Sequence, residues 1–422
     1  MSCRPDASGP RVLYVSSSIG LGHASKDLAI AGELRRLAPG IEILWVAGRP
    51  ASDVLRKAGE NVVPETEQWR GASQIAERSV RNGQLDLVRY VYRSLPAWAA
   101  NALLFQKIVA AHHVDIAVGN EAYEVDVPLV AGLLRPAVPF VMIFDFVATD
   151  AMGRNVFDHV GAWFLNALWS LDGRVYGGSR HSAVFIGEAG DIPDIPFGWL
   201  LPNRRQHAQR YYNIVGHAMN LRPDEFTDRT AWRRRLGYGD EPLVICSAGG
   251  TAIGREMLEL CGAAAPVLRE SHPGLQMVLV CGPRLPAESV RTPEGVTVLG
   301  YVPRLFEHMA CCDAAVVQCG ASSTTELAAL AIPFVYFPIE GHFEQELVAA
   351  RLARYGVGTR RLLRSTTPEE LASAIRGELE RKVVRTAMPL SGAAEAARHI
   401  LGVLKDSGRI RGTQQVIIDT AG

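Results

Sequence analysis

A short motif in the C-terminal half of the chain combines a strand, a glycine turn and a helix start that carries hydroxyl groups. Residues 313–319 form an apolar run that is typical of a buried strand, Gly320 follows it, and Ser322 and Ser323 open the next segment. The first turn of a helix leaves backbone N–H groups unpaired and carries a positive partial charge, so small residues beside a glycine can approach phosphate oxygens closely. The motif therefore predicts an anion-binding turn.

Polar side chains that suit a sugar follow this turn. Glu326 lies within the first turns of the predicted helix, where its carboxylate can accept hydrogen bonds from two neighbouring ribose hydroxyls. A second predicted strand, 333–338, leads to Glu344 and Gln345, which can bond further sugar hydroxyls. The segment predicts the binding half-site for a nucleotide-activated sugar. A capped helix that simply follows a strand is the plainer interpretation of the same residues.

Another glycine turn begins the second half of the chain. Residues 243–247 are predicted as a strand, and Gly249, Gly250 and Thr251 follow it. Successive backbone N–H groups in such a turn can cradle a phosphate. This second turn favours the functional interpretation of the downstream motif, because a motif gains meaning from its context.

A histidine follows the first predicted strand of the chain, 12–17. The strand ends in SSSIGLGHAS, where Gly20 and Gly22 let the backbone approach a ligand and His23 lies at the start of a helix. Histidine suits a general base because its unperturbed pKa lies near working pH. A capping or hydrogen-bonding histidine is the alternative. The loop lacks the third glycine of a dinucleotide fingerprint, so a dehydrogenase is disfavoured.

The motif QCGASSTTE, followed by P-x-x-x-x-x-E-Q, resembles the donor signature of the inverting nucleotide-sugar glycosyltransferases with the GT-B fold. This UDP-glycosyltransferase superfamily includes plant secondary-product transferases, glycolipid synthases and the N-acetylglucosaminyltransferase of the peptidoglycan lipid intermediate. The resemblance implies that Gln318, Ser322 and Ser323 contact the phosphates. It also implies that Glu326 binds the ribose, and that Glu344 and Gln345 bind the hydroxyl groups of the sugar. Gln318 stands where the plant pattern has histidine.

The same resemblance assigns roles to the other loops. Gly249, Gly250 and Thr251 would face the donor diphosphate, and Tyr301 and Val302 would pair with the uracil edge. His23 would take the proton of the acceptor hydroxyl. Its acidic partner in the plant enzymes matches Asn120 here, which is not acidic. The neighbouring Glu121 is therefore the predicted partner, with Glu124 and Asp126 behind it, and Asp145 is predicted to point into the acceptor cleft.

Composition limits the other function classes. Lys+Arg and Asp+Glu both number 44, and this balance disfavours a general nucleic-acid-binding protein. The seven cysteines lack metal-ligand spacing, and we expect them to be reduced core residues. The sequence shows no run of 18 apolar residues and no signal-peptide core at residues 1–11, so we expect a cytoplasmic protein. The aromatic helix predicted at 156–169 lies upstream of the arginines at 202–210, which allows peripheral membrane contact, although core packing is the commoner role.

The whole pattern predicts an α/β chain of two Rossmann-like doubly wound domains that face a cleft. We expect an N-terminal acceptor-binding domain over 1–217, a linker over 218–228 and a nucleotide-sugar-binding domain over 229–390. Residues 391–422 would provide a helix that crosses back to the first domain, and a tail. Residues 64–110 are predicted to form helices that shape an acceptor pocket, with core packing as the alternative.

The function implied is a metal-independent glycosyltransferase. It would move a sugar from a nucleoside diphosphate, UDP by resemblance, to a hydroxyl group of a lipid or small-molecule acceptor, with inversion at the anomeric carbon. No cofactor is expected beyond the nucleotide-sugar co-substrate, and no metal, because helix N-termini can stabilise the leaving diphosphate. A nucleotide-sugar epimerase or hydrolase of the same fold, and a non-catalytic nucleotide-sugar-binding protein, are the alternatives.

Overall fold

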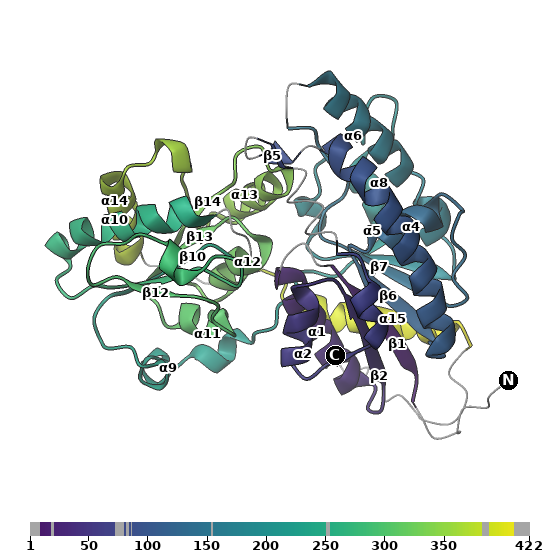
Figure 1. Cartoon of the computed structure of the whole chain (residues 1–422), viewed down its shortest axis with the longest axis horizontal. Helices are drawn as coiled ribbons and strands as arrows, with labels where there is room; N and C mark the ends of the chain where they lie inside the picture. Colours follow the sequence, from purple (N-terminus) through teal and green to yellow (C-terminus); the bar gives the residue numbers. More distant parts are fainter. Residues whose placement is uncertain are drawn as a thin grey trace. The chain divides into compact units, whose positions relative to one another are not determined.

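The chain divides into two compact units, each built around its own parallel sheet (Figure 1). The computed structural model describes residues 9–17, 21–71, 80–81, 84–85, 87–152, 155–249, 254–381 and 388–408, and the side chains of 21 and 80–92 are not described. Unit 1 comprises Met1–Asn220 and Pro389–Gly422, and unit 2 comprises Leu221–Met388. The first boundary falls inside the segment predicted as a linker.

Unit 1 contains a seven-stranded sheet in the order β3-β2-β1-β6-β7-β8-β9, with every neighbouring pair parallel. Its central strands are buried on both faces, which explains why they read as continuous apolar runs. We had predicted no strand at β8. The strands are β1 (Arg11–Ser16), β2 (Glu42–Ala47), β3 (Asn61–Val62), β6 (Ile116–Asn120), β7 (Phe140–Phe144), β8 (His181–Phe185) and β9 (Tyr212–Ile214).

Helices cover both faces of this sheet (Figure 1). One hydrophobic cluster joins the strands to α1 (Leu21–Leu37), α2 (Ala51–Lys57) and α15 (Gly392–Asp406). A second cluster joins them to α4, α5, α7 and α8. These last helices and α6 have the bounds α4 (Leu87–Ala111), α5 (Tyr123–Val130), α6 (Val156–Trp169), α7 (Gly173–Tyr176) and α8 (Arg204–Tyr211), and the short hairpin strands are β4 (Val80–Arg81) and β5 (Gln84–Leu85).

Unit 2 contains a six-stranded parallel sheet in the order β12-β11-β10-β13-β14-β15. Its strands are β10 (Leu243–Ser247), β11 (Gln276–Val280), β12 (Thr297–Leu299), β13 (Ala314–Gln318), β14 (Phe334–Phe337) and β15 (Thr359–Arg360). Its helices are α9 (Arg229–Leu236), α10 (Arg255–Ser271), α11 (Leu305–Ala310), α12 (Ala321–Ala329), α13 (Phe343–Tyr355) and α14 (Pro368–Glu380). Helices α10 and α14 share one hydrophobic cluster with the strands.

The parallel arrangement decides where the site residues gather. In an open parallel sheet the carboxyl ends of all strands meet at one edge, and ligands bind there. The loops that carry the predicted site residues all begin at such an edge, in unit 1 after β1, β6 and β7 and in unit 2 after β10, β12, β13 and β14. Among the described residues, no helix combines the length and the apolar character that a bilayer crossing requires.

Candidate active site

The two predicted phosphate turns of unit 2 lie side by side. Strands β10 and β13 are neighbours, with Ser247 opposite Val317, so the turns that follow them share one edge. Gly249 has φ +71°, a conformation that favours glycine, and its N–H donates to the Ser247 hydroxyl at 3.2 Å. A Cβ at Gly249 would lie 4.0 Å from Gln318 Oε1, which places the Gln318 side chain beside this turn.

Helix α12 begins directly after Gly320 and presents its N-terminus to open space. Gly320 is the N-cap residue, and a Cβ built on it would meet nothing within 4 Å. Ser322 and Ser323 are half-buried in the first turn. The Thr324 hydroxyl instead donates to the Gly320 carbonyl at 2.8 Å, so it stabilises the helix start. The turn thus retains the free space and the hydroxyl groups that an anion requires.

Glu326 is a buried carboxylate in the second turn of α12. Only 9% of the residue is exposed, and burial raises the pKa of its carboxyl to about 8. Burying an unpaired carboxylate is unfavourable, and such groups concentrate at functional sites. Two neighbouring ribose hydroxyls would supply the donors that a carboxylate at this position requires.

The remaining predicted donor contacts surround these turns. Tyr301 is 38% exposed and Val302 is half-buried, just after β12. Glu344 is half-buried in the first turn of α13. Gln345 is buried, and its Oε1 accepts a hydrogen bond from the backbone N–H of Ile339 at 2.7 Å. Gln345 therefore positions the loop before α13, and its amide nitrogen can donate to a sugar hydroxyl.

In unit 1, His23 lies between two carboxylates. Its Nδ1 is 3.3 Å from Asp145 Oδ2, and its Nε2 is 3.6 Å from Glu121 Oε2. The ammonium of Lys26 forms an ion pair with the same Asp145 carboxylate. Gly22 precedes His23 in the first turn of α1. Glu121 is thus the carboxylate neighbour that we predicted, and Asp145 is a second one that we had assigned only to the acceptor cleft.

The carboxylates control the charge of His23. Burial alone would lower the pKa of the imidazole, but Glu121 and Asp145 outweigh it and raise the pKa to about 9. Burial likewise opposes ionisation of Asp145, yet Lys26 and His23 hold the pKa of its carboxyl well below its usual range. At neutral pH the resting site therefore contains an imidazolium and an ionised Asp145.

A strained backbone aims Glu121 at the site. Glu121 directly follows β6 and has φ 47°, a left-handed conformation that is uncommon for residues other than glycine. Such strain persists at functional sites because the surrounding structure enforces it. Asn120, the last residue of β6, instead turns inward and donates to Asp27 Oδ1 at 2.7 Å. Asn120 thus helps to hold α1, the helix that carries His23, against β6.

The other two predicted carboxylates of this loop face away from His23. Glu124 accepts a hydrogen bond from Trp69 Nε1 at 3.1 Å, and Asp126 accepts one from the Tyr176 hydroxyl. Burial raises the pKa of each carboxyl to about 7. They belong to the packing of α5 against its neighbours, and neither is a second partner of His23 behind Glu121.

Lys26 and Asp27 also belong to this site, although their roles were not predicted from the sequence. Both lie three or four residues after His23 on α1, and residues at this spacing share one helix face. Asp27 is buried and accepts hydrogen bonds from the hydroxyls of Tyr14 and Ser16 on β1. The sequence feature that could have indicated their role is the pair of charged residues directly after the glycine loop.

Three predicted residues, Gly20, Gly250 and Thr251, lie outside the described residues. Within the described part of the chain, one group of side chains has potential metal ligands close together: Glu188, Asp191 and His217 offer atoms within 4.8 Å of one another. The Asp191 carboxylate, however, accepts a hydrogen bond from the Glu188 N–H at 2.8 Å in a helix capping box. Helix capping accounts for the contact between Glu188 and Asp191, and His217 Nε2 lies 3.8 Å from the same Asp191 carboxylate.

Helix α6 exposes more aromatic surface than a core helix would. Phe157 is 77% exposed and Phe164 is 64% exposed. Trp163 donates through Nε1 to the carbonyl of Trp199, which brings the 195–200 loop against the helix, and Trp199 is itself 79% exposed. Core packing therefore accounts for only part of this helix, and its remaining apolar surface is available to a partner.

A family comparison identifies the second half of the chain. Residues 244–400 match the glycosyltransferase family 28 C-terminal domain. This part of the chain is thus similar to the C-terminal domain of family 28 glycosyltransferases. The match spans the turns at Gly249 and Gly320, Glu326 and the loop before α13. It confirms the resemblance that was drawn from the motif QCGASSTTE.

Relatives and solved structures agree with this domain. An uncharacterized glycosyltransferase of Methanopyrus kandleri is 28% identical over 45% of this chain and 54% of its own. The UDP-N-acetylglucosamine--N-acetylmuramyl-(pentapeptide) pyrophosphoryl-undecaprenol N-acetylglucosamine transferase of Mycolicibacterium vanbaalenii is 30% identical over 44% and 48%. The chain thus spans about half the length of these relatives. The glycotransferase of kitacinnamycin superposes with a TM-score of 0.59 at 15% identity, covering 94% of this chain and 95% of that one.

These findings confirm the predicted fold, two Rossmann-like units of the GT-B type. The family domain and the relatives named as glycosyltransferases also support a transferase enzyme.

Proposed function

We propose that this protein is an inverting glycosyltransferase that moves a sugar from a UDP-linked donor to a hydroxyl group of a lipid or small-molecule acceptor. The observation that carries the proposal is the buried Glu326 carboxyl, placed in the second turn of α12 behind an open, hydroxyl-bearing helix N-terminus. A helix N-terminus suits the donor phosphates, and the carboxylate suits the ribose. The relative that uses UDP-N-acetylglucosamine supports a UDP-linked donor.

In this proposal unit 2 binds the donor. The diphosphate lies against the turns at Gly249 and Gly320, Glu326 accepts from the ribose hydroxyls, and the residues after β12 contact the base. Glu344 and the amide nitrogen of Gln345 bind the sugar. As the bond between the anomeric carbon and the diphosphate oxygen breaks, negative charge grows on the diphosphate. The N–H groups at the start of α12 stabilise this charge in the transition state, so no metal ion is required.

His23 acts on the acceptor. Its imidazole takes the proton of the acceptor hydroxyl while the oxygen attacks the anomeric carbon from the face opposite the diphosphate, which inverts the configuration. Asp145 at Nδ1 orients the ring and stabilises the imidazolium that forms, as carboxylates do in other dyads. Because the resting imidazole has a pKa of about 9, only its deprotonated fraction can start the reaction at neutral pH.

Calorimetric titration with UDP and with a panel of UDP- and dTDP-sugars tests the donor half. We expect UDP to bind the wild type and Glu326→Ala to lose that binding. Glu270→Ala is the matched control, because Glu270 is exposed in the last turn of α10, away from the carboxyl edge of the sheet, and should leave binding unchanged. Absence of nucleotide binding by the wild type would overturn the proposal.

Product analysis tests the chemistry. His23→Ala should lower the transfer rate by roughly two to four orders of magnitude and leave UDP affinity intact. Wild-type protein incubated with a UDP-sugar and no acceptor should return the sugar unchanged. An epimerised or hydrolysed sugar would instead favour the epimerase or hydrolase alternative, and transfer by His23→Ala at the wild-type rate would remove the base assignment.

We also propose that the exposed face of α6 contacts a lipid surface, which suits a lipid acceptor. Aromatic side chains such as Phe157, Phe164 and Trp199 partition favourably into the interface of a bilayer. Phe157→Ser with Phe164→Ser should reduce co-sedimentation with phosphatidylglycerol vesicles, whereas Leu133→Ser, an 84% exposed position in the loop after α5, should not. Equal co-sedimentation of all variants would contradict this contact.

A further inference from the structure

Lys26 lies on the same face of α1 as His23, and the proposed mechanism gives it no role. The two residues are three positions apart, a spacing that makes their side chains neighbours on a helix surface. Only 8% of Lys26 is exposed, which is uncommon for a lysine. A buried ammonium requires a partner of opposite charge, and here the partner is the carboxylate of Asp145, directly after β7.

Lys26 and His23 share a single oxygen atom of Asp145. The Lys26 ammonium forms its ion pair with Oδ2, and His23 Nδ1 lies 3.3 Å from the same Oδ2. A charge-assisted hydrogen bond from nitrogen to a carboxylate is usually about 2.7–2.9 Å long, so the imidazole is held less closely than such a bond allows. The lysine thus takes up part of the negative charge that would otherwise face the imidazole alone.

The other charged groups near His23 come from the neighbouring elements. Glu121, which follows β6, lies 3.6 Å from His23 Nε2, at the other nitrogen of the ring. Asp27, the residue after Lys26 on α1, accepts a hydrogen bond from the Tyr14 hydroxyl of β1, and its charge also acts on His23. Carboxylates from three elements therefore lie around His23, and the Lys26 ammonium opposes their charge.

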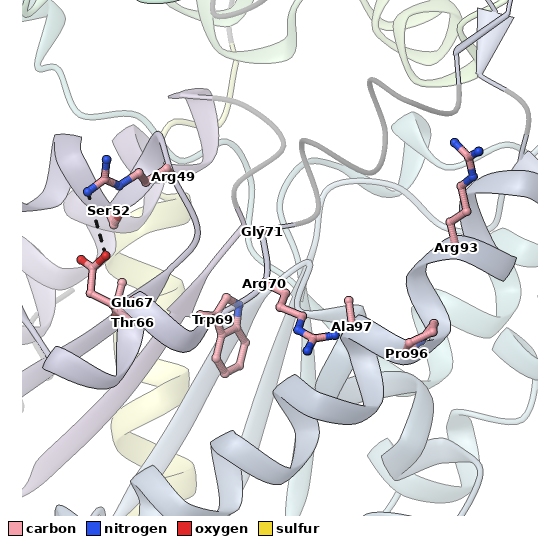
Figure 2. Close-up of a pocket in the computed structure, with 10 residues that line it drawn as sticks. All are labelled: Arg49, Ser52, Thr66, Glu67, Trp69, Arg70, Gly71, Arg93, Pro96 and Ala97. Carbon is pink, nitrogen blue, oxygen red and sulfur yellow. Dashed lines mark ion pairs between the residues drawn. The ribbon is translucent and has the colours of Figure 1, made fainter.

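The arginine of the adjoining loop has a different partner. Arg49 follows β2, the strand next to β1, and lines a cavity of about 440 Å³ in unit 1. Figure 2 shows its ion pair with Glu67, at 3.9 Å. Its side chain is 67% exposed, so water and salt screen its charge. The charge that opposes the carboxylates beside His23 therefore comes from Lys26.

We propose that Lys26 is a positioning residue of the transfer, which shares the Asp145 carboxylate with His23 and so keeps the imidazole able to release its proton near neutral pH. The inference rests on the proposed function and deepens it, because it explains how a histidine among several carboxylates can still act as a base. Burial and Lys26 both favour the neutral ring, whereas Glu121 and Asp145 favour the imidazolium. Without the ammonium, a smaller fraction of His23 could accept a proton.

An NMR titration of the His23 imidazole in the full chain tests this charge effect without any substrate. Lys26→Met keeps the length of the apolar stem and removes the ammonium, so we expect the pKa of His23 to rise by roughly one pH unit. Lys26→Gln, which can still donate to Asp145 but carries no charge, should shift the pKa in the same direction, and Lys26→Arg should restore it. An unchanged or lowered pKa in both uncharged variants would overturn the inference.

Lys107→Met is the matched control for this titration. Lys107 is exposed near the end of α4, which leads to the amino end of β6, whereas His23 lies at the carboxyl edge of the same sheet. Its replacement removes the same charge from the same unit and should leave the pKa of His23 at its wild-type value. A shift as large as that in Lys26→Met would assign the effect to net charge and overturn the contact through Asp145.

Transfer kinetics give a second readout that a merely structural role would not produce. At pH 7, Lys26→Met should show a kcat/KM about tenfold below that of the wild type, because a pKa higher by one unit leaves a tenth of the deprotonated imidazole. The two proteins should approach the same kcat/KM above about pH 10, where His23 is deprotonated in both. An equal loss of kcat/KM at every pH would overturn the positioning role.

The outcomes also separate this inference from the proposed function. Failure of UDP to bind the wild type would overturn the donor assignment, while a raised pKa of His23 in Lys26→Met would still support the shared Asp145 carboxylate. A raised pKa without any pH-dependent loss of transfer would remove His23 as the base, and with it the role of Lys26 in the transfer.

Discussion

At the scale of single residues, the charge of His23 decides how the proposed transfer depends on pH. Because the pKa of its imidazole is about 9, the deprotonated fraction grows tenfold per pH unit from neutral pH up to that value. We therefore expect kcat/KM for transfer to rise with pH and to level off near pH 9. Glu121→Gln removes the largest influence that raises this pKa, so the rise of kcat/KM should occur at lower pH in this variant.

Glu124→Gln provides the control for this experiment. Glu124 lies three residues after Glu121, in the first turn of α5, but it accepts from Trp69 rather than facing His23, so its replacement should leave the pH dependence of kcat/KM unchanged. An NMR titration of the His23 imidazole should give the same pKa values without any acceptor. His23 would be excluded as the base if kcat/KM of the wild type did not change between about pH 6 and 9. It would also be excluded if Glu121→Gln left the pH dependence of kcat/KM unchanged.

Glu326 predicts a second pH effect at this scale. Its folded pKa of about 8 lies above its ordinary value of 4.5, so the unfolded state loses its proton first as the pH rises. The stability contributed by protonated Glu326 is therefore complete below about pH 4.5 and lost as the pH approaches 8. The free energy of unfolding should fall over this window, and Glu326→Gln should reduce the slope. Urea denaturation at several pH values measures it, and identical slopes in both proteins would contradict the burial of this carboxyl.

At the scale of elements, helix α1 holds His23 through a buried hydrogen-bond network. Asp27, one turn after His23, accepts from Tyr14 and Ser16 of β1 and from Asn120 of β6. This network locks the first turns of the helix onto two central strands. In Asp27→Asn an amide nitrogen replaces Oδ2 opposite the Ser16 hydroxyl and the charge-assisted hydrogen bonds are lost, which should lower the free energy of unfolding by about 1–3 kcal/mol.

Urea denaturation and the His23 pH profile together test this role. Asp406→Asn, at the exposed last position of α15, should leave stability unchanged. If Asp27 positions His23, then Asp27→Asn should also lower kcat at temperatures where the variant remains folded. Loss of stability with an unchanged kcat would reduce Asp27 to a purely structural residue.

Element boundaries limited what could be predicted about the site. The strand–turn–helix motif at Gly320 was readable because its residues are contiguous, and so was the glycine loop before His23. The partner of His23 was harder to predict, because side chains at neighbouring strand ends point in different directions. β6 extends through Asn120, which faces Asp27, while Glu121 and Asp145 come from two different strand ends. The spacing of residues within one segment cannot predict that side chains from two different strand ends lie close together.

At the scale of the whole molecule, the order of the strands accounts for the features that the sequence did not reveal. The cavity of unit 1 that Arg49, Arg70 and Arg93 help to line joins residues from three separate segments, and no single motif marks it. No motif showed either that the side-chain oxygen of Gln345 accepts a hydrogen bond from the backbone N–H of Ile339. Apolar periodicity, in contrast, predicted the two Rossmann-like sheets, because parallel strands are buried on both faces and read as apolar runs.

The path of the chain between its units leads to a prediction for the whole molecule. Helix α15 follows unit 2 in the sequence but packs in the core of unit 1, where Ala396, Ala397, Ile400 and Leu404 are fully buried against α1 and the sheet. Unit 2 is one continuous segment, Leu221–Met388, with its own hydrophobic cluster. Ile400→Ala should therefore destabilise unit 1 by about 2–5 kcal/mol, through lost burial and the cavity that remains, and leave unit 2 intact.

Thermal unfolding with and without UDP distinguishes the two units. We expect Ile400→Ala to lower the Tm of the transition that UDP does not shift, while the calorimetric affinity for UDP stays at its wild-type value. Lys405→Ala, an exposed position one turn further along α15, should change neither quantity. A parallel loss of UDP affinity in Ile400→Ala would show that the donor site depends on the first unit, and the assignment of the donor to unit 2 alone would then fail.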